Sequence, residues 1–342
     1  MKWGGLFLCL FLIACSQGEE PVAAPDSFET MIGELRSPWD IEHDGSTFYV
    51  TERDGTIASW TEADGLGRLP VETNQPITQE GEGGLLGFAL FPDFEESNRA
   101  FAYHTYRENS SLKNRVIVIE KENQRWVEKD VLLADIPGAQ FHNGGRLEIG
   151  PDEKLYVTTG DALEESLAQD VNSLAGKLLR MDMDGSIPND NPLEGSYVYS
   201  YGHRNPQGIA WSDTGDMYAS EHGPDNHDEI NRIEAGENYG WPEIVGEEER
   251  EGLQTPLYET GRDTWAPSGI ETFNDRLIIA SLRGTALRSM ALDGSSPEVV
   301  TDGYGRIRDV ELIDGALYFV TNNTDGRGQP DNEDDRLIRY DP

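Results

Sequence analysis

The stretch Gln207–Gly223, QGIAWSDTGDMYASEHG, shows the pattern that decides the fold. Alternating apolar residues lead into a turn rich in Asp and Gly, and a second strand with an aromatic residue follows. This order is typical of a β-hairpin. Five other stretches repeat it: Trp39–Glu52, Leu86–Tyr106, Gly145–Asp161, Ser268–Gly284 and Ile307–Asn323. The sequence therefore predicts an all-β fold built from six related hairpins.

The spacing of the hairpins predicts their assembly. A four-stranded propeller blade takes about 40–50 residues, and the repeats follow one another at roughly this interval. We therefore expect a six-bladed β-propeller with four-stranded antiparallel blades over residues 29–342. The last apolar segment, Asp335–Tyr340, is expected to pair with an early segment, so that no sheet edge stays open. A β-sandwich, or two smaller β domains, is the alternative.

Residues 1–15, MKWGGLFLCLFLIAC, have the pattern of a secretory signal peptide. Lys2 precedes an apolar run from Leu6 to Ile13 that is too short to span a bilayer. Because it ends on Cys15, the segment resembles the lipobox of bacterial lipoproteins. That resemblance implies lipidation of Cys15, and Ser16 after it implies sorting to the outer membrane. An ordinary signal peptide cut nearby is the alternative, and residues 16–28 are expected to form a flexible tether.

The composition excludes several classes of function. Both cysteines, Cys9 and Cys15, lie in the predicted signal peptide, so the rest of the chain has no thiol for a disulfide, for cysteine ligation of a metal or for nucleophilic catalysis. The 64 acidic and 27 basic residues give a net charge of −37. Such a chain repels nucleic acid and anionic lipid, so we expect no nucleic-acid partner and contact with a membrane only through the lipid anchor.

Polar residues suited to binding or catalysis lie at the ends of the predicted hairpins, where the loops of a propeller converge on one mouth of the central channel. They are Glu82 before the second hairpin, His142 before the third, Arg204 and Asn205 before the fourth, Gly223 and Pro224 after it, Arg283 after the fifth, and Arg306 and Arg308 at the start of the sixth. Cations for anionic groups thus lie beside oxygen donors for a hard metal ion. The combination suits an acidic cofactor bridged by Ca²⁺.

Several motifs in family order carry a specific resemblance. GEGGLLGFALFPDF, HNGGRLEIGPDEKLYVTTGD, GHRNPQGIAW, EHGPDNHDEINRIEAGENYGWPE, WAPSGI and GRIRDV lie between Gly81 and Val310. With them the chain resembles the glucose/sorbosone dehydrogenases, in particular the soluble aldose sugar dehydrogenases that use pyrroloquinoline quinone (PQQ) and Ca²⁺. The resemblance implies oxidation of an aldose at C1 to the lactone, with electrons passing from PQQ to a quinone or cytochrome acceptor.

The resemblance also implies roles for individual residues. His142 would be the general base, Asp161 would orient its ring, and Arg204 would complete the catalytic set. The cofactor would be held by Glu82, His142, Arg204, Asn205, Arg283, Arg306 and Arg308. The metal would be held by the carbonyl oxygens of Gly223 and Pro224, with Asp228 as an oxygen partner. Three positions depart from the family pattern: Phe141 and Glu82 stand where an acidic residue and a glutamine occur, and Arg283 where lysine is common.

Simpler interpretations of single residues stay open. His142 alone would be an ordinary loop residue, and Asp228 and Glu229 could cap a turn. His222, His227 and Asp225 could bind a transition metal, although an H-x₄-H pair is a weak signal. The segments Asp325–Gly328 and Asp331–Asp335 could hold a second Ca²⁺ or form a solvated turn. We place Trp265 near the mouth, where its ring could stack on a sugar or quinone.

Two other functions compete with the dehydrogenase. A Ca²⁺-dependent propeller hydrolase, such as a lactonase, needs side-chain oxygen ligands on the channel axis, and the arginines at the mouth argue against it. A propeller that only binds a glycan or protein has no need of His142 and Asp161 beside those arginines.

Overall fold

The computed structural model describes Met1 and residues 27–342. The predicted signal peptide, Cys15 and most of the predicted tether therefore lie outside the described residues. The first strand, β1 (Ser27–Ile32), includes the last two residues of the segment predicted as tether. In the described part of the chain, no helix is both long and apolar enough to cross a membrane.

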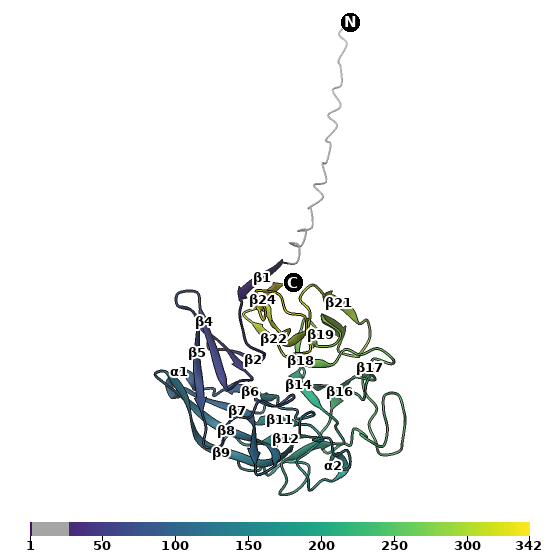
Figure 1. The fold of residues 1–342 in the computed structure, drawn as a ribbon. Coiled ribbons are helices and arrows are strands. Elements are labelled where there is room, and N and C mark those ends of the chain that lie inside the picture. The colour runs from purple at the N-terminus through teal and green to yellow at the C-terminus, as the bar shows by residue number, and fades with distance from the viewer. Residues whose placement is uncertain (2–26) are drawn as a thin grey trace.

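Antiparallel sheets arranged around a common centre make up the fold (Figure 1). Three sheets each use four consecutive strands: β10 (Leu147–Ile149), β11 (Leu155–Thr159), β12 (Lys177–Met181) and β13 (Val198–Tyr201); β14 (Pro206–Trp211), β15 (Met217–Glu221), β16 (Glu229–Ile233) and β17 (Tyr258–Glu259); and β18 (Pro267–Phe273), β19 (Arg276–Ser281), β20 (Ala286–Ala291) and β21 (Glu298–Thr301).

An eight-stranded sheet covers the N-terminal third of the described chain. Its strands are β2 (Pro38–His43), β3 (Phe48–Glu52), β4 (Thr56–Thr61), β5 (Gly65–Glu72), β6 (Leu85–Leu90), β7 (Arg99–Glu108), β8 (Ser111–Glu122) and β9 (Arg125–Gly138). The strand pairing that links the halves β2–β5 and β6–β9 into one sheet is parallel and lies between β5 and β9, with Val71 opposite Trp126 and Glu72 opposite Val127. Two short helices, α1 (Phe94–Ser97) and α2 (Ser166–Gln169), lie in connections.

The remaining sheet joins the two ends of the chain. It consists of β22 (Ile307–Ile313), β23 (Ala316–Thr321), β24 (Leu337–Asp341) and β1, which pairs with β24 as its outer strand. Phe28 of β1 stacks on Tyr340 with ring centroids 4.6 Å apart. The predicted pairing of the last apolar segment with an early one is therefore confirmed, and all six predicted hairpins are antiparallel strand pairs.

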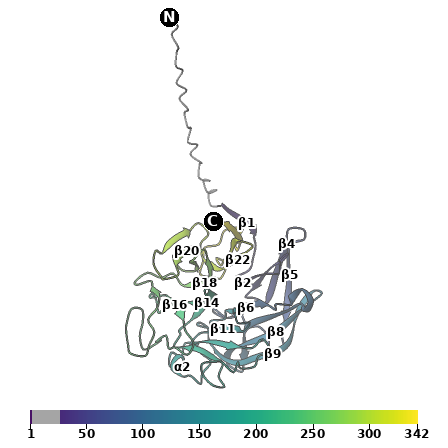
Figure 2. The ribbon, with the colours of Figure 1, turned by 180° about the vertical axis from the view of Figure 1, so that it is seen from behind.

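The first strands of the hairpins pack around the centre. β2 contacts β6 and β22, β6 contacts β10, and β18 contacts β14 and β22 (Figures 1 and 2). Two glycines permit this close approach. A Cβ on Gly87 would lie 2.1 Å from the carbonyl oxygen of Gly145, and one on Gly208 would lie 2.2 Å from that of Ser268. Apolar clusters fill the space between sheets, as where Tyr156 of β11 meets Trp211 of β14 edge to face at 5.1 Å.

Acidic side chains gather along the inner strands at the end remote from the hairpin-end loops. Glu42, Glu148, Glu271 and Glu311 come from four different inner strands and act electrostatically on one another. Burial raises the pKa of Glu42 to about 8 and that of Glu271 to about 7. Nearer the site, Arg146 bridges Asp40 at 2.6 Å and Asp309 at 2.8 Å.

This arrangement predicts an unusual pH dependence. Between about pH 4.5 and 8, a carboxyl with a raised pKa keeps its proton in the folded state and loses it in the unfolded state. Its contribution to the free energy of unfolding is therefore lost as the pH rises through that window. Replacing Glu42 or Glu271 by Gln should therefore raise the unfolding temperature at pH 8.5 and leave it nearly unchanged at about pH 5. Glu95→Gln, on the exposed turn of α1, serves as the control. Equal shifts at both pH values would contradict the prediction.

Candidate active site

The β14–β15 hairpin sets the frame of the site. Pro206 pairs with Glu221, so the residues before β14 and after β15 leave the sheet side by side. Nη1 of Arg204 donates to the carbonyl of His222 at 3.1 Å, and the His222 amide donates to the carbonyl of Asn205 at 3.2 Å. The sequence correctly predicted that these two segments lie together.

His142 and Asp161 form a hydrogen-bonded pair beside this hairpin. Nδ1 of His142 lies 2.8 Å from Oδ1 of Asp161. Because an ionised carboxylate can only accept, Nδ1 carries a proton and the lone pair of the neutral ring lies on Nε2. Asp161 is fully buried, whereas 14% of the His142 side chain is exposed. Nε2 of His142 can therefore act as a base at the solvent-exposed side, while Asp161 fixes the tautomer of the ring.

The backbone at His142 is held in a conformation that few residues adopt. His142 has φ 60° and Ala162 has φ 55°. The His142 amide donates to Oε2 of Glu82 at 3.2 Å, and the Ala162 amide donates to the carbonyl of His142 at 3.2 Å. Next to it, the amide of Gly144 donates to the side chain of Asn205 at 3.1 Å. These bonds from three segments hold the left-handed conformation in place.

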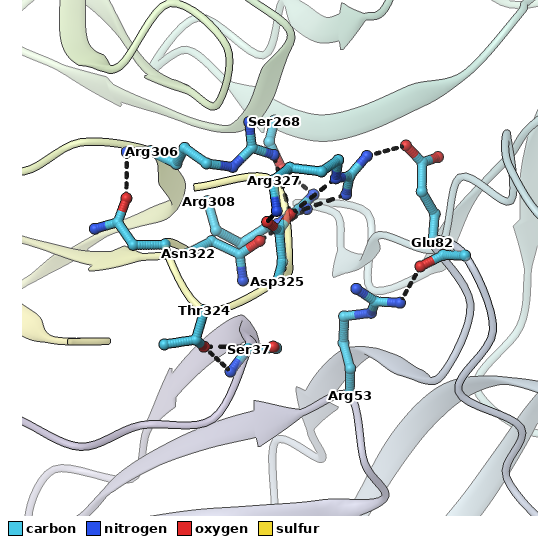
Figure 3. A network of polar contacts seen from close by, with 12 residues as sticks. Ser37, Arg53, Glu82, Ser268, Arg306, Arg308, Asn322, Thr324, Asp325 and Arg327 are labelled. Carbon is cyan, nitrogen blue, oxygen red and sulfur yellow. Dashed lines mark hydrogen bonds and ion pairs between the residues drawn. The ribbon is translucent and has the colours of Figure 1, made fainter. Parts of the chain in front are cut away.

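Guanidinium groups crowd the same end of the channel (Figure 3). Arg327 donates to Oε1 of Glu82 at 2.8 Å and pairs with Asp325 at 3.0 Å. Arg306 also pairs with Asp325, at 3.0 Å. Arg308 donates to Gln207 at 2.7 Å and to Ser268 at 3.2 Å, and Arg53 donates to carbonyls of the loop that carries Glu82. Arg306 and Arg327 thus pair with the two carboxylates, whereas Arg53 and Arg308 bond only to uncharged oxygens.

The electrostatics show that positive charge is in excess here. Burial, together with neighbouring cations, lowers the pKa of Arg308 to about 9, and burial also lowers the pKa of Arg306 and of Arg53. Burial alone would raise the pKa of Glu82, but His222 and Arg327 lower it to about 2. Because burial lowers the pKa of His222 to about 4, Arg327 is the charged partner of Glu82 at neutral pH. Glu82 is therefore an anionic acceptor and a poor base.

Buried nitrogen atoms in and beside this cluster lack partners. Among the described residues, Nε of Arg204, Arg306 and Arg308 and Nε2 of His222 are buried without a hydrogen bond. Leaving such a group unsatisfied costs about 1–3 kcal/mol, and more when it is charged. Three cationic N–H groups that converge on one mouth fit a ligand with several anionic oxygens.

The predicted metal loop is organised by Asp228. Its Oδ1 accepts from the amide of Gly223 at 2.9 Å, and its Oδ2 accepts from the amides of Trp265 and Ala266 at 2.7 and 2.8 Å. The carbonyl of Pro224 accepts from the amide of Asn226 at 2.6 Å. Asp228 therefore joins the Gly223 loop to the next sheet, and metal ligation by Asp228 stays a prediction.

Other predicted residues lie farther from the cluster. Arg283 is exposed and only reaches the carbonyl of Asp225, at 3.4 Å. The ring of Trp265 stacks on Tyr258 at 5.2 Å and lines a cavity of about 580 Å³ with Arg288, while its amide bonds to Asp228 of the Gly223 loop. Stacking of this ring on a sugar or quinone stays a prediction.

The alternative metal sites find no support in the side-chain contacts. His227 pairs with Glu259 at 2.9 Å, and within residues 27–342 the group of acidic or histidine ligands close enough for a metal is Asp40, Asp309 and Glu311. Asp325, predicted either as a calcium ligand or in a solvated turn, has a buried side chain that pairs with Arg306 and Arg327.

Comparison with known proteins identifies the family of the chain. The family model for glucose/sorbosone dehydrogenase matches residues 35–338. The chain belongs to this family. Quinoprotein glucose dehydrogenase B of Acinetobacter calcoaceticus is 39% identical over 209 residues, which cover 52% of the chain and 44% of that relative. The aldose sugar dehydrogenase of Escherichia coli is 29% identical over 94% of the chain and 96% of its own length.

Solved structures of family members agree with the fold. The PQQ-bound form of aldose sugar dehydrogenase from Streptomyces coelicolor superposes with a TM-score of 0.85 at 36% identity, covering 92% of the chain and 98% of that structure. A glucose dehydrogenase-like oxidoreductase from Thermus thermophilus gives 0.86 at 38% identity, with 92% and 99% covered.

Two members of the arginine cluster, Arg53 and Arg327, were missed by the sequence analysis. Arg53 directly follows β3, at the end of the first predicted hairpin. Its signal is the same as that of Gly223 and Arg283, which lie at the ends of later hairpins. Arg327 had no comparable signal, because it lies within the 15-residue connection between β23 and β24.

The contacts of Asp228 predict a role that does not need a metal. Asp228→Asn should lower the stability of the metal-free apo-protein by about 1–3 kcal/mol, because buried amides lose a charged acceptor. Chemical denaturation checks the loss, and amide exchange at Gly223 and Trp265 should accelerate. Asp225→Asn, exposed in the same loop, is the control. An unchanged apo-protein would mean that Asp228 acts only when metal is bound.

Proposed function

We propose that the protein is a PQQ- and Ca²⁺-dependent dehydrogenase that oxidises aldose sugars at C1 to the lactone. The observation that carries this proposal is the oriented His142–Asp161 pair beside converging arginines whose buried Nε–H groups have no partner. One arrangement offers a base for the sugar hydroxyl and cations for an anionic cofactor. The family and the PQQ-bound relative support the same assignment.

The donor set fits PQQ. The cofactor is a flat quinone with three carboxylates, and Arg204, Arg306 and Arg308 offer the free cationic donors that such groups need. Asn205 fixes the amide of Gly144 beside them. We assign these residues to the cofactor, with Arg283 at the rim. Arg53 and Arg327 add to the positive charge that favours its reduced, more anionic form.

The chemistry divides between the cofactor and the chain. PQQ, when bound, would supply an electrophilic quinone that can accept hydride from C1, and Ca²⁺ would supply Lewis-acid polarisation. His142 takes the proton of the anomeric hydroxyl on Nε2, and Asp161 stabilises the imidazolium that forms. Glu82 holds the backbone of His142 through its amide. The ion pair with Arg327 keeps Glu82 charged, and neither group transfers a proton.

The carbonyl oxygens of Gly223 and Pro224 are the proposed protein ligands of Ca²⁺, a hard cation that prefers oxygen. Asp228 would keep this loop in place. A hydrolase would instead need carboxylate ligands at the mouth, where Glu82 and Asp325 are engaged by Arg327 and Arg306. That arrangement favours the dehydrogenase over the lactonase.

We further propose that the fold is a six-bladed propeller. The two-residue pairing of β5 with β9 then represents contact between adjacent blades, and the eight-stranded sheet counts as two of them. The six hairpins and the inner strands around one centre support this count.

Metal linkage gives the first test. If Ca²⁺ bridges PQQ to the Gly223 loop, a chelator should abolish sugar-dependent dye reduction by the purified holoenzyme. PQQ alone should not restore the activity, whereas PQQ with Ca²⁺ should. Full recovery in metal-free buffer would remove Ca²⁺ from the proposal.

The membrane anchor is tested separately. We propose that Cys15 is lipidated, that the protein is held at the outer membrane and that it passes electrons to a quinone or cytochrome. Cys15→Ala should move the protein from the detergent phase to the aqueous phase, or leave it unprocessed, without changing its unfolding temperature. Wild-type protein that already partitions into the aqueous phase would contradict lipidation.

The base is tested by His142→Asn, which keeps much of the size but removes the proton acceptor. PQQ should still bind, because its proposed contacts come from arginines, Asn205 and Ca²⁺. Turnover should fall by on the order of 10²–10⁴. His43→Asn, on β2 at the remote end, is the control. Near wild-type turnover would assign the base elsewhere, and loss of PQQ binding would make His142 a cofactor ligand.

A further inference from the structure

The indole of Trp241 reaches the carboxylate that orients the proposed base. Nε1 of Trp241 donates to Oδ2 of Asp161 at 2.9 Å. The other oxygen, Oδ1, accepts from Nδ1 of His142 and from the amide of Leu163, both at 2.8 Å. The two oxygens of the buried carboxylate therefore bond to different groups.

The main chain and ring of Trp241 are fixed by its neighbours. Its amide donates to the carbonyl of Gly202 at 2.9 Å, and its carbonyl accepts from the side chain of Gln169 in α2 at 2.6 Å. The guanidinium carbon of Arg204 lies 5.3 Å from the centre of the ring. Only 9% of the residue is exposed. The indole N–H is thus held at a set place and cannot follow Asp161 if the carboxylate turns.

We propose that Trp241 is a positioning residue for the base, an inference that rests on the proposed function. His142 and the amide of Leu163 both bond to Oδ1, so Trp241 is the hydrogen-bond partner of Oδ2 within the described residues. The terminal torsion of an aspartate has a broad preference, so without the indole donor the carboxylate can turn about its Oδ1 contacts. The indole N–H removes that freedom and keeps Oδ1 directed at His142. It also draws part of the negative charge toward Oδ2, away from the imidazole. Through its face, the same ring supports Arg204, a proposed cofactor-binding cation.

The first experiment needs neither PQQ nor sugar. The ring of His142 is titrated by NMR in the ¹³C-histidine-labelled apo-protein, with His142→Asn used to assign its signal. In Trp241→Phe the midpoint should move to higher pH, because a carboxylate without the indole donor stabilises the imidazolium more strongly. Trp211→Phe, at the far end of β14, should leave the midpoint where it is. An unchanged midpoint in Trp241→Phe would overturn the inference.

The wild-type protein supplies a second measurement should Trp241→Phe fail to fold. The Nε1–H resonance of Trp241 should shift with the same midpoint as the ring of His142, because both groups bond to one carboxylate. The indole resonance of Trp265, whose backbone contacts a different carboxylate, should not follow it. A Trp241 resonance that stays constant through the titration of His142 would show that no coupling exists.

Holoenzyme kinetics complete the test. Trp241→Phe should lower kcat by about 10- to 100-fold with little change in PQQ affinity, the usual effect of losing a partner that orients a site residue. The acid limb of the kcat/KM profile should move to higher pH. In an Asp161→Asn background the added Trp241→Phe change should cost little more, whereas independent losses would contradict the proposed coupling. If sugar oxidation is absent but the apo-protein titration shifts, the proposed function fails while the positioning contact stands.

Discussion

The excess of buried positive charge at one end of the inner strands is the constraint on which the site depends. Three buried arginines, Arg53, Arg306 and Arg308, meet the more exposed Arg327 there. Within residues 27–342 the four have two carboxylate partners, Glu82 and Asp325, which pair with Arg327 and Arg306. Within a chain of net charge −37, this concentration is not a property of the surface at large. Charged groups are costly to bury unless they are paired, so an arrangement of this kind is explained best by a ligand that supplies the missing anions.

The propeller-like packing makes this concentration possible. Inner strands that approach across Gly87 and Gly208 bring the ends of separate hairpins within reach of one another. The loops then brace each other: Glu82 holds the amide of His142 and the guanidinium of Arg327 at once. The left-handed backbone at His142 is stable for the same reason, since contacts from several segments determine it. Charge and base geometry thus arise from one set of loop contacts.

The sequence predicted the parts that follow a local period. Six hairpins, the pairing of the chain ends and the positions of His142, Asp161 and Arg204 come from strand alternation and from residues next to strand ends. The sequence did not predict contacts that depend on the direction in which a side chain points. Arg327 reaches Glu82 across 245 positions of the chain, and the ring of Trp265 stacks on Tyr258 although its backbone lies beside the predicted metal loop. The raised pKa of Glu42 also required the other inner strands in place. Such features depend on tertiary packing, which a single strand does not encode.

The most direct test of the charge constraint compares two ligands that differ in charge. Apo-protein with Ca²⁺ is titrated with PQQ and with its trimethyl ester, which keeps the quinone but loses the three carboxylate charges, and tryptophan fluorescence quenching reports binding. Each lost charge-assisted hydrogen bond weakens binding by about 1.5–3 kcal/mol, so the ester should bind at least about 100-fold more weakly. Equal affinity for the two compounds would contradict the claim that the arginine cluster is built to receive an anion.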